Sequence, residues 1–488
     1  MKTAGLFLLL TILCCAKAVI GFQRLSPEQH YARFQERAAS RRLEENIGRV
    51  FYLTNFGADP KGANDSSDAI EKAIENAFKV QHDKNMLEGV NDLGGVVIDL
   101  QGGDYKISRT ISFPPNGGGN VLIQGGSIRA SENFKNKGCY LVQLWSPATT
   151  REGHENSPCK PNTKADIKKT ALQVYYEDIT FRDILFDSNH HGGGILAVNA
   201  VRIRIDNCYF KGFTTEGIKV EKGHEVFISS SFLGQTETIG GDKREKDFSG
   251  IAISLDGNDH AVTDVAIFSA AVGVLLSGQA NILTGVHCYN KATGFGGVGI
   301  LGKASCAQTR IDNCYMDYNS ILLEDPEQMH ITNTFFLGDG NVKLRAVNGE
   351  VHGLTIVNNM FSGNDNWVPI VSLDQSDAKF HKVGQVVIDN NVVNDMVLKA
   401  TKARKTVAGK GKKWTADFQS VLVFKDLVSH VDYSLYVKNH GGNTTLPAHA
   451  ITSVKNNKVV VEATAEVDGV VSVAVDQYLA PGETNHLH

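Results

Sequence analysis

Three acidic side chains precede apolar stretches that begin with glycine, and their positions suit proton-transfer chemistry. Asp187 precedes GGGILAV, Glu216 precedes GIKVE, and Asp242 lies in a longer segment, 234–250, before GIAISLD. Two carboxyl groups held at a fixed separation can act as general acid and general base in one reaction. Whether these three work together depends on the elements that position them.

Cationic and imidazole side chains accompany these carboxylates. Lys219 lies in the GIKVE stretch, and Lys243 and Arg244 lie in the longer segment. Cations of this kind offset the charge of an anionic ligand. His224 follows the same stretch on its exit side. Three interpretations are open for it: it orients a ligand, it shuttles a proton, or it has only a structural role. No His or Cys cluster has metal-ligand spacing, so we expect neither a metal nor a cofactor.

A repeated word indicates how the chain is organised. RIDNCY occurs at 204–209 and again at 310–315. Around it, an Asx or small residue followed three places later by a large one recurs mostly at steps of 20 to 26, with one step of 36. A second short strand, usually opened by glycine or another small residue, follows most of these units. The pattern predicts an all-β, right-handed parallel β-helix whose coils stack about 4.8 Å apart. A leucine-rich repeat has a similar period, but its L-x-x-L-x-L frame is absent.

The repeat also assigns structural roles within each coil. Alternation along RIRIDNCYF predicts that Asn207 points inward and bonds to its neighbours up the stack, and Asn313 occupies the same place four coils later. Cys208 and Cys314, inside the repeated word, are predicted to be buried and unpaired.

The N-terminus predicts secretion. Residues 1–18 have the charge, apolar run and A-x-A site of a signal peptide, and no other apolar stretch is long enough to span a membrane. Secretion permits disulfides, and Cys139 and Cys159 flank a polar loop that one bridge would close. Asn64 and Asn443 begin N-glycosylation sequons. The formal charge is −4, and −6 without the signal, which gives no sign of nucleic-acid binding.

The remaining segments are predicted to cap and extend the solenoid. We expect a helical arm at 19–47, the β-helix at 48–400 with a capping helix at 64–78, and a small antiparallel β extension at 401–488. Four stretches of the extension are predicted strands: VLVF, SLYV, KVVVEA and VVSVAV. Seven basic residues and no acidic ones lie between 399 and 413, either as a mobile linker or as an anchor for a polyanion.

Several segments resemble a known family. YLTNFGADPKGANDSSDAIEKAI, 52–74, resembles the entry segment of pectate-lyase-like β-helix proteins. With GGGILAV, TEGIKVEKGHE, FSGIAISLDGNDH and GVHCYNKATGFGG, residues 48–400 are similar to the plant QUARTET-type polygalacturonases, and the similarity extends into the C-terminal segment. The resemblance implies a secreted, monomeric enzyme that hydrolyses the α-1,4-galacturonan of cell-wall pectin. Its partner is the polysaccharide, with no nucleic acid and no membrane after signal cleavage.

The resemblance also implies a site, although the motifs are incomplete. Thr214–Lys219 lies where typical polygalacturonases have Asn-Thr-Asp-Gly-Ile-Asp, so Glu216 stands in for an aspartate and Lys219 reverses the second charge. The Gly-His-Gly and Arg-Ile-Lys motifs are not in their expected places. In those enzymes the cleft lies where the turn enters the glycine-initiated strand.

Coil geometry then selects an acid/base pair. Asp187 and Asp242 are two coils apart, about 9.6 Å, which suits inversion with a water between two carboxyls. We therefore hypothesise that these two are the acid and base and that Glu216 is a third carboxylate or a substitute. Lys219 and Arg244 would bind uronate carboxylates, with Lys243 beside them. The alternatives are that Asp187 only caps a turn and that 234–250 is a solvated loop.

Two other functions remain open. A polysaccharide lyase on the same fold would need calcium ligands and Arg244 or Lys219 as a base, and no clear cluster of calcium-binding carboxylates is present. A non-catalytic pectin-binding protein is compatible with the missing motifs.

Overall fold

The structure is a computed structural model that describes residues 49–80, 86–134, 138–147, 159, 174–235, 249–289, 297–438 and 446–483. Phe51–His488 form one compact unit. The predicted signal segment 1–18 and helical arm 19–47 lie outside the described residues. No helix in the described ranges is long and apolar enough to cross a membrane.

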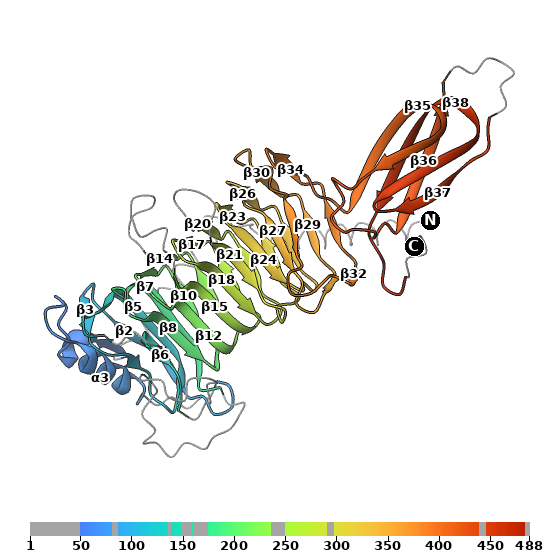
Figure 1. The fold of residues 1–488 in the computed structure, drawn as a ribbon. Helices are drawn as coiled ribbons and strands as arrows, with labels where there is room; N and C mark the ends of the chain where they lie inside the picture. The colour runs from blue at the N-terminus through green and yellow to red at the C-terminus, as the bar shows by residue number, and fades with distance from the viewer. Residues whose placement is uncertain are drawn as a thin grey trace, which may run out of the picture. The chain divides into compact units, whose positions relative to one another are not determined.

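A short helical segment precedes the first coils. The 3₁₀ helix η1 spans Leu53–Phe56, and the α-helix α3 spans Ser67–Ala77 (Figure 1). The predicted helix at 64–78 is therefore present. Asp65 supplies the side-chain oxygen at its start, because Oδ1 accepts the Ser67 N–H at 3.1 Å. Ile70 and Ile74 on the apolar stripe belong to the solenoid core, so the helix covers the first coil.

In the described residues the coils contribute strands to three parallel stacks, which together with one further short strand form one sheet of 32 strands. Stack 1 contains β4 (Ile111–Ser112), β6 (Tyr140–Leu144), β8 (Gly193–Val198), β12 (Glu216–His224), β15 (Ile251–Asn258), β18 (Val272–Ser277), β21 (Val298–Gly302), β24 (Ser320–Glu324), β27 (Val342–Arg345) and β31 (Val371–Asp374). Stack 2 contains β1 (Val50–Tyr52), β2 (Asp92–Asp99), the first parts of β5 (Gly118–Ala130) and β7 (Tyr176–Asp187), β10 (Arg204–Asp206), β13 (Phe227–Ser229), β16 (Ala261–Thr263), β19 (Ile282–Thr284), β22 (Arg310–Asp312), β25 (His330–Thr332), β29 (Thr355–Val357) and β33 (Val387–Asp389).

Stack 3 contains β3 (Asp104–Ile107), the second parts of β5 and β7, β11 (Tyr209–Lys211), β14 (Phe232–Gly234), β17 (Ala266–Phe268), β20 (His287–Tyr289), β23 (Tyr315–Asp317), β26 (Phe335–Leu337), β30 (Met360–Ser362) and β34 (Val392–Asn394). The short strands β9 (Ala200–Val201), β28 (Glu350–His352) and β32 (Lys382–Gly384) lie beside the stacks. The predicted parallel β-helix is confirmed by this pairing.

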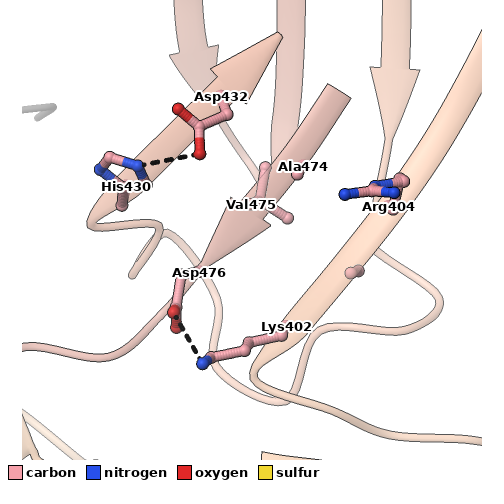
Figure 2. Close-up of a pocket in the computed structure, with 8 residues that line it drawn as sticks. Lys402, Arg404, His430, Asp432, Ala474, Val475 and Asp476 are labelled. Atoms are coloured by element: carbon pink, nitrogen blue, oxygen red, sulfur yellow. Dashed lines mark hydrogen bonds and ion pairs between the residues drawn. The ribbon is translucent and has the colours of Figure 1, made fainter. Parts of the chain in front are cut away.

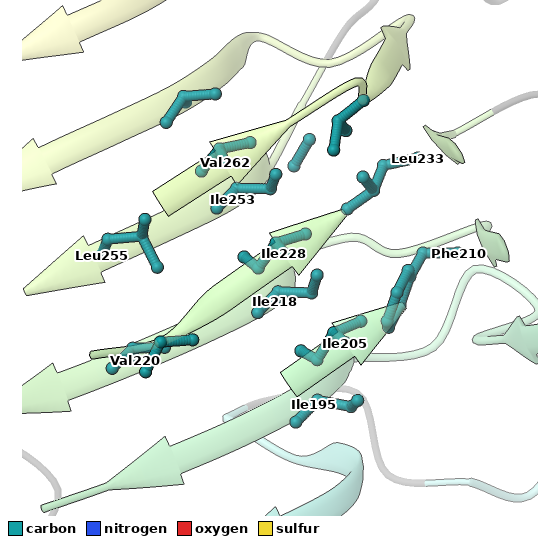
Figure 3. Close-up of a cluster of buried hydrophobic side chains, with 14 of the residues drawn as sticks. Ile195, Ile205, Phe210, Ile218, Val220, Ile228, Leu233, Ile253, Leu255 and Val262 are labelled. Atoms are coloured by element: carbon teal, nitrogen blue, oxygen red, sulfur yellow. The ribbon is translucent and has the colours of Figure 1, made fainter. Parts of the chain in front are cut away.

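The core of the solenoid is built from columns of inward side chains. Ile195, Ile218 and Ile253 are directly opposite one another in stack 1, and each is fully buried. Ile205 and Ile228 form the matching column in stack 2 (Figure 3). Because each coil buries its apolar side chains against the next, the core is continuous along the stack.

The repeated word marks one position on two coils. Arg204–Asp206 and Arg310–Asp312 are strands of stack 2, and the pairing β10–β13–β16–β19–β22 separates them by four coils as predicted. Cys208 and Cys314 are buried and free, which was also predicted.

The prediction that Asn207 and Asn313 point inward is wrong. Both are exposed, and both adopt the left-handed conformation, with φ of 50° and 52°. This conformation interrupts the alternation of the strand, so the following residue faces the core instead. The Asn207 side chain still bonds along the stack, since Nδ2 donates to Asp183 Oδ1 at 2.6 Å, but it does so at the surface.

The inward position after this corner carries a ladder of polar side chains. The Cys208 N–H donates to Ser231 Oγ at 3.0 Å on the next coil. Further along, the Thr334 N–H donates to Asn359 Oδ1 at 2.9 Å, and the Asn359 N–H donates to Asn391 Oδ1 at 3.0 Å. Buried backbone groups at the corner are satisfied in this way.

A separate antiparallel sheet follows the last coil. It contains β35 (Lys402–Asp417), β36 (His430–Val437), β37 (His449–Lys455) and β38 (Lys458–Asp476), and β38 pairs with each of the others. Its own core includes Trp414 and Val471. The basic segment at 399–413 therefore lies mostly in β35, and the alternative of a mobile linker is wrong.

The strand predictions for this sheet need two corrections. VLVF, 421–424, is not a strand: Leu422 forms one isolated bridge with Ala400, and Leu422 and Phe424 pack into two different cores, that of the sheet and that of the solenoid. KVVVEA and VVSVAV, predicted as two strands, are the two ends of β38. SLYV lies in β36 as predicted.

Candidate active site

An ionic cluster lies on the outer face of stack 1, at the start of β12. Ile218 and Val220 point into the core. Lys219, which lies between them, and Glu221, which follows, therefore project outward. Glu216 begins the strand. Gly217 follows it because a Cβ there would lie 2.7 Å from the Ala252 carbonyl oxygen of the next coil.

Hydrogen bonds fix the orientation of the Glu216 carboxylate. Tyr140 Oη, from β6, donates to Oε2 at 2.6 Å, and Lys219 Nζ donates to Oε1 at 2.8 Å. The same ammonium lies 3.4 Å from Glu221 Oε1. The side chains of Glu216, Lys219 and Glu221 are each at least four-fifths buried, which strengthens their mutual attraction relative to pairs in water.

The separation of the two carboxylates limits their chemistry. Glu216 Oε1 and Glu221 Oε1 both contact one nitrogen, so they lie no more than about 6 Å apart. Retaining glycosidases hold their carboxyls about 5–5.5 Å apart and inverting ones about 6.5–9.5 Å. The bound holds for one oxygen of each group, so this pair of carboxylates fits either class.

A third carboxylate lies on the neighbouring coil. Asp256, near the end of β15, accepts hydrogen bonds from Ser277 Oγ and from the Lys222 N–H, both at 3.3 Å. Adjacent strands in a sheet are about 4.8 Å apart, so this side chain borders the cluster of β12.

The contacts of Asp187 are with residues outside this cluster. It ends β7, where Oδ1 accepts the Asn189 N–H at 2.9 Å and Oδ2 lies 3.6 Å from Lys211 Nζ on the outer face of stack 3. The Asn189 hydrogen bond is the turn cap that was the alternative interpretation. Among the described residues, no contact joins Asp187 to Glu216.

Asp242, Lys243 and Arg244 lie outside the described residues. The residues on either side of their segment are joined, however. Gln235 Nε2 donates to Ser249 Oγ at 3.0 Å, and the Ser249 N–H donates to Gln235 Oε1 at 3.1 Å. The predicted insertion therefore leaves and re-enters the fold at one place, directly before β15.

His224 and Asn64, two further predicted residues, lie at the surface. His224, at the end of β12, is half-exposed, and its Nδ1 lies 3.1 Å from Asp259 Oδ2. Asn64 is exposed, and its amide donates to Asp59 Oδ2 at 3.1 Å. Asn443 lies outside the described residues.

Cys139 and Cys159 form a disulfide, with Cα atoms 5.4 Å apart. In the described part of the chain, no group of three or more His, Cys, Asp or Glu side chains could hold a metal ion.

Sequence reasoning missed Tyr140 and Glu221. The period-two alternation of EGIKVEK was the signal that could have placed Glu221 beside Lys219 on the outer face. Tyr140 gave no comparable signal, because it comes 76 residues before Glu216 and meets it only through the stacking of coils.

The fold and the cluster together define a parallel β-helix protein with carboxylates and a lysine on the outer face of stack 1. The chain is 50% identical over 431 residues, 88% of its length and 84% of the relative's, to Polygalacturonase QRT3 of Arabidopsis thaliana. It therefore belongs to the QRT3-type polygalacturonase family, which confirms the resemblance seen in the sequence. No family model matches the chain.

Solved structures of similar fold are more distant. ORF18 of Geobacillus virus E2 has a TM-score of 0.47 and 10% identity, covering 92% of this chain and 81% of its own. The Dettilon tailspike protein gp208 has a TM-score of 0.46 and 12% identity, covering 88% and 95%. A GH87 α-1,3-glucanase of Streptomyces thermodiastaticus has 0.43 and 14%, covering 72% and 68%. The fold assignment rests on the strand pairing described above and not on these similarities.

Proposed function

We propose that this protein is a secreted glycoside hydrolase that cleaves the α-1,4-galacturonan of pectin in the plant cell wall. Family membership supports the substrate class, since the relative is named a polygalacturonase. The observation that carries the proposal is the Glu216 carboxylate, which Tyr140 and Lys219 hold in one orientation on the outer face of stack 1.

The roles follow from the chemistry of glycosidic cleavage. One carboxyl group protonates the leaving oxygen, and a second carboxylate activates water or attacks the sugar. Glu216 takes one of these roles, and Glu221, which shares Lys219 with it, is a candidate for the other. Lys219 contacts both and also provides positive charge where a uronate carboxylate would bind.

The stereochemistry depends on which carboxylate is the partner of Glu216. The family resemblance implies inversion, and the Glu216 and Glu221 carboxylates around Lys219 fit either outcome. Asp256 on the neighbouring coil and Asp242, predicted from the sequence, are the other candidate partners. The anomer of the first product, followed by proton NMR, distinguishes the two cases.

The test uses the secreted protein on de-esterified polygalacturonate, with chelator and then with calcium. New reducing ends without ultraviolet absorbance would show hydrolysis. Absorbance of unsaturated uronate that rises with the ends, and only with calcium, would show a lyase and refute the proposal. Absence of both on every pectin tested would favour a non-catalytic binding protein.

Replacement of Glu216 tests the site itself. Glu216→Gln keeps the shape but cannot exchange a proton, so the rate should fall by about 10²–10⁴-fold, the usual contribution of a general acid or base. Glu350→Gln is the matched control, because Glu350 also pairs with a lysine, Lys382, at 2.8 Å but lies in β28. Equal rates for the two variants would remove Glu216 from the mechanism.

A further inference from the structure

A shallow pocket of about 360 Å³ lies on the C-terminal sheet, far in sequence from the cluster of β12 (Figure 2). Its lining residues come from three adjacent strands: Lys402, Ala403, Arg404, His430, Asp432, Ala474, Val475 and Asp476.

Strand register explains the shape of this pocket. Arg404, Ala474 and Asp432 are directly opposite one another across β35, β38 and β36. Residues directly opposite in antiparallel strands project from the same face. Because Ala474 has only a methyl group, the surface dips between the guanidinium and the carboxylate.

Of the three basic side chains around the pocket, two have acidic partners and one has none among the described residues. Lys402 Nζ lies 3.5 Å from Asp476 Oδ2, and His430 Nε2 lies 3.2 Å from Asp432 Oδ2 (Figure 2). Arg404 is exposed, and the described residues offer it no ion pair or hydrogen bond. A planar guanidinium with free N–H groups is the side chain best suited to bidentate recognition of a carboxylate.

An aromatic ring lies on the same face. Tyr436 is 68% exposed and follows Asp432 by four residues in β36, a distance of about 13 Å along the strand. Between them the face carries short side chains, those of Ser434 and of Ser472 opposite it. An extended sugar chain could therefore lie on this face, from the guanidinium to the ring, without meeting a bulky side chain.

The net charge of the sheet favours an anionic ligand. Residues 402–478 contain ten Lys and Arg against seven Asp and Glu, a formal charge of +3, whereas the whole chain carries −4. A positive region on a negative protein attracts a polyanion to that region and not to the rest of the surface.

We propose that this face of the C-terminal sheet is a non-catalytic binding site for a short run of an anionic uronan. Arg404 pairs with one uronate carboxylate, and the ring of Tyr436 packs against the apolar face of a sugar several units away. The identity of the uronan as galacturonan rests on the proposed function, but the binding itself does not require catalysis.

The experiment measures binding of the full-length protein to de-esterified polygalacturonate by affinity gel electrophoresis, with dextran as the neutral polysaccharide. The Glu216→Gln background prevents degradation of the ligand during the run. Arg404→Ala should weaken binding about tenfold, the effect of losing one charge-assisted contact, and Tyr436→Ala should weaken it by a similar factor through loss of ring–sugar packing. Arg404→Lys, which keeps the charge but not the fork, should bind with intermediate strength.

Lys412→Ala is the matched control, because Lys412 is an exposed cation of β35 outside the pocket. Unchanged binding in this variant, with loss in Arg404→Ala and an unchanged melting temperature, supports the site. Equal loss in both variants would show non-specific attraction and overturn it.

The outcome is separable from that of the proposed function. If the wild-type protein cleaves pectate but Arg404→Ala binds as tightly as before, the hydrolase proposal stands and this site is refuted. If nothing is cleaved but binding depends on Arg404 and Tyr436, the site stands and the hydrolase proposal is the one that fails.

Discussion

His260 lies in the turn after β15 with its ring almost completely buried. Nδ1 accepts the Val226 N–H at 3.2 Å, and in the part of the chain that the structure describes Nε2 has no hydrogen-bond partner. Burial lowers the pKa of His260 from 6.5 to about 4. The imidazole is therefore neutral in the folded protein at pH values where it would be charged in the unfolded chain.

This difference predicts a loss of stability in acid. Between pH 6.5 and about 4 the unfolded chain binds the proton that folded His260 does not, so the free energy of unfolding falls as the pH falls through this window, by about 3 kcal/mol in all. In His260→Asn, whose amide oxygen can still accept the Val226 N–H, urea unfolding at several pH values should show a shallower decline. His330→Asn, at an exposed position, is the control, and equal slopes in both variants would contradict the assignment.

At the same scale, the sequence predicted part of the candidate site. Glu216 and Lys219 were identified because the motif around them resembles that of the family, and the structure brings them together. Asp187 was predicted for the same cleft, but it ends the part of β7 that belongs to stack 3, where Lys211 of the next coil is its neighbour. A position before a glycine-initiated strand does not reveal the direction in which the preceding strand points its last side chain.

The corner between stack 2 and stack 3 is the element that sequence periodicity described least well. The repeating Asn residues were visible, but the left-handed conformation at this corner, which exchanges inside for outside, was not. The asparagine with the structural role is therefore the residue after the left-handed corner. On one coil the corner residue is Asn358, and Asn359, which follows it, is fully buried. Its Nδ2 donates to the Ile331 carbonyl at 3.0 Å, and its Oδ1 accepts the Thr334 N–H.

Asn359→Leu should therefore destabilise the protein much more than Asn207→Ala. The leucine would leave a buried N–H and a buried C=O without partners, at about 1–3 kcal/mol each, whereas Asn207 is exposed and its loss costs about 1 kcal/mol of left-handed strain. Midpoints of chemical denaturation would measure the difference. A more damaging Asn207→Ala would contradict this ranking of the two asparagines.

On the scale of the whole molecule, the solenoid was predictable and the C-terminal sheet was only partly so. The repeat of 20 to 26 residues fixes a stack of coils because every coil obeys the same rule of burial. No repeat constrains residues 402–476. The apolar run VLVF predicts a strand there, but its Leu422 packs into the core of the sheet and its Phe424 into the core of the solenoid.

The unequal charge of the two regions predicts that pectate binding depends on salt. The sheet carries +3 within a chain of −4, so its attraction to a polyanion is screened as ionic strength rises. Between about 0.05 and 0.5 M NaCl, where the screening length falls from roughly 14 to 4 Å, binding measured by gel retardation should weaken severalfold. The same series with Arg404→Ala should be flatter, and an identical salt dependence would place the electrostatic contact elsewhere.

The four buried cysteines give this solenoid a property that its function does not use. Cys208, Cys288, Cys306 and Cys314 are free, and burial raises the pKa of each thiol, to about 12 for the first and the last. A thiol reagent can modify them only when the surrounding coil opens, because the reactive thiolate is otherwise both hidden and scarce. The order in which they are labelled under native conditions would therefore trace the path along which the molecule comes apart, coil by coil, without any introduced probe.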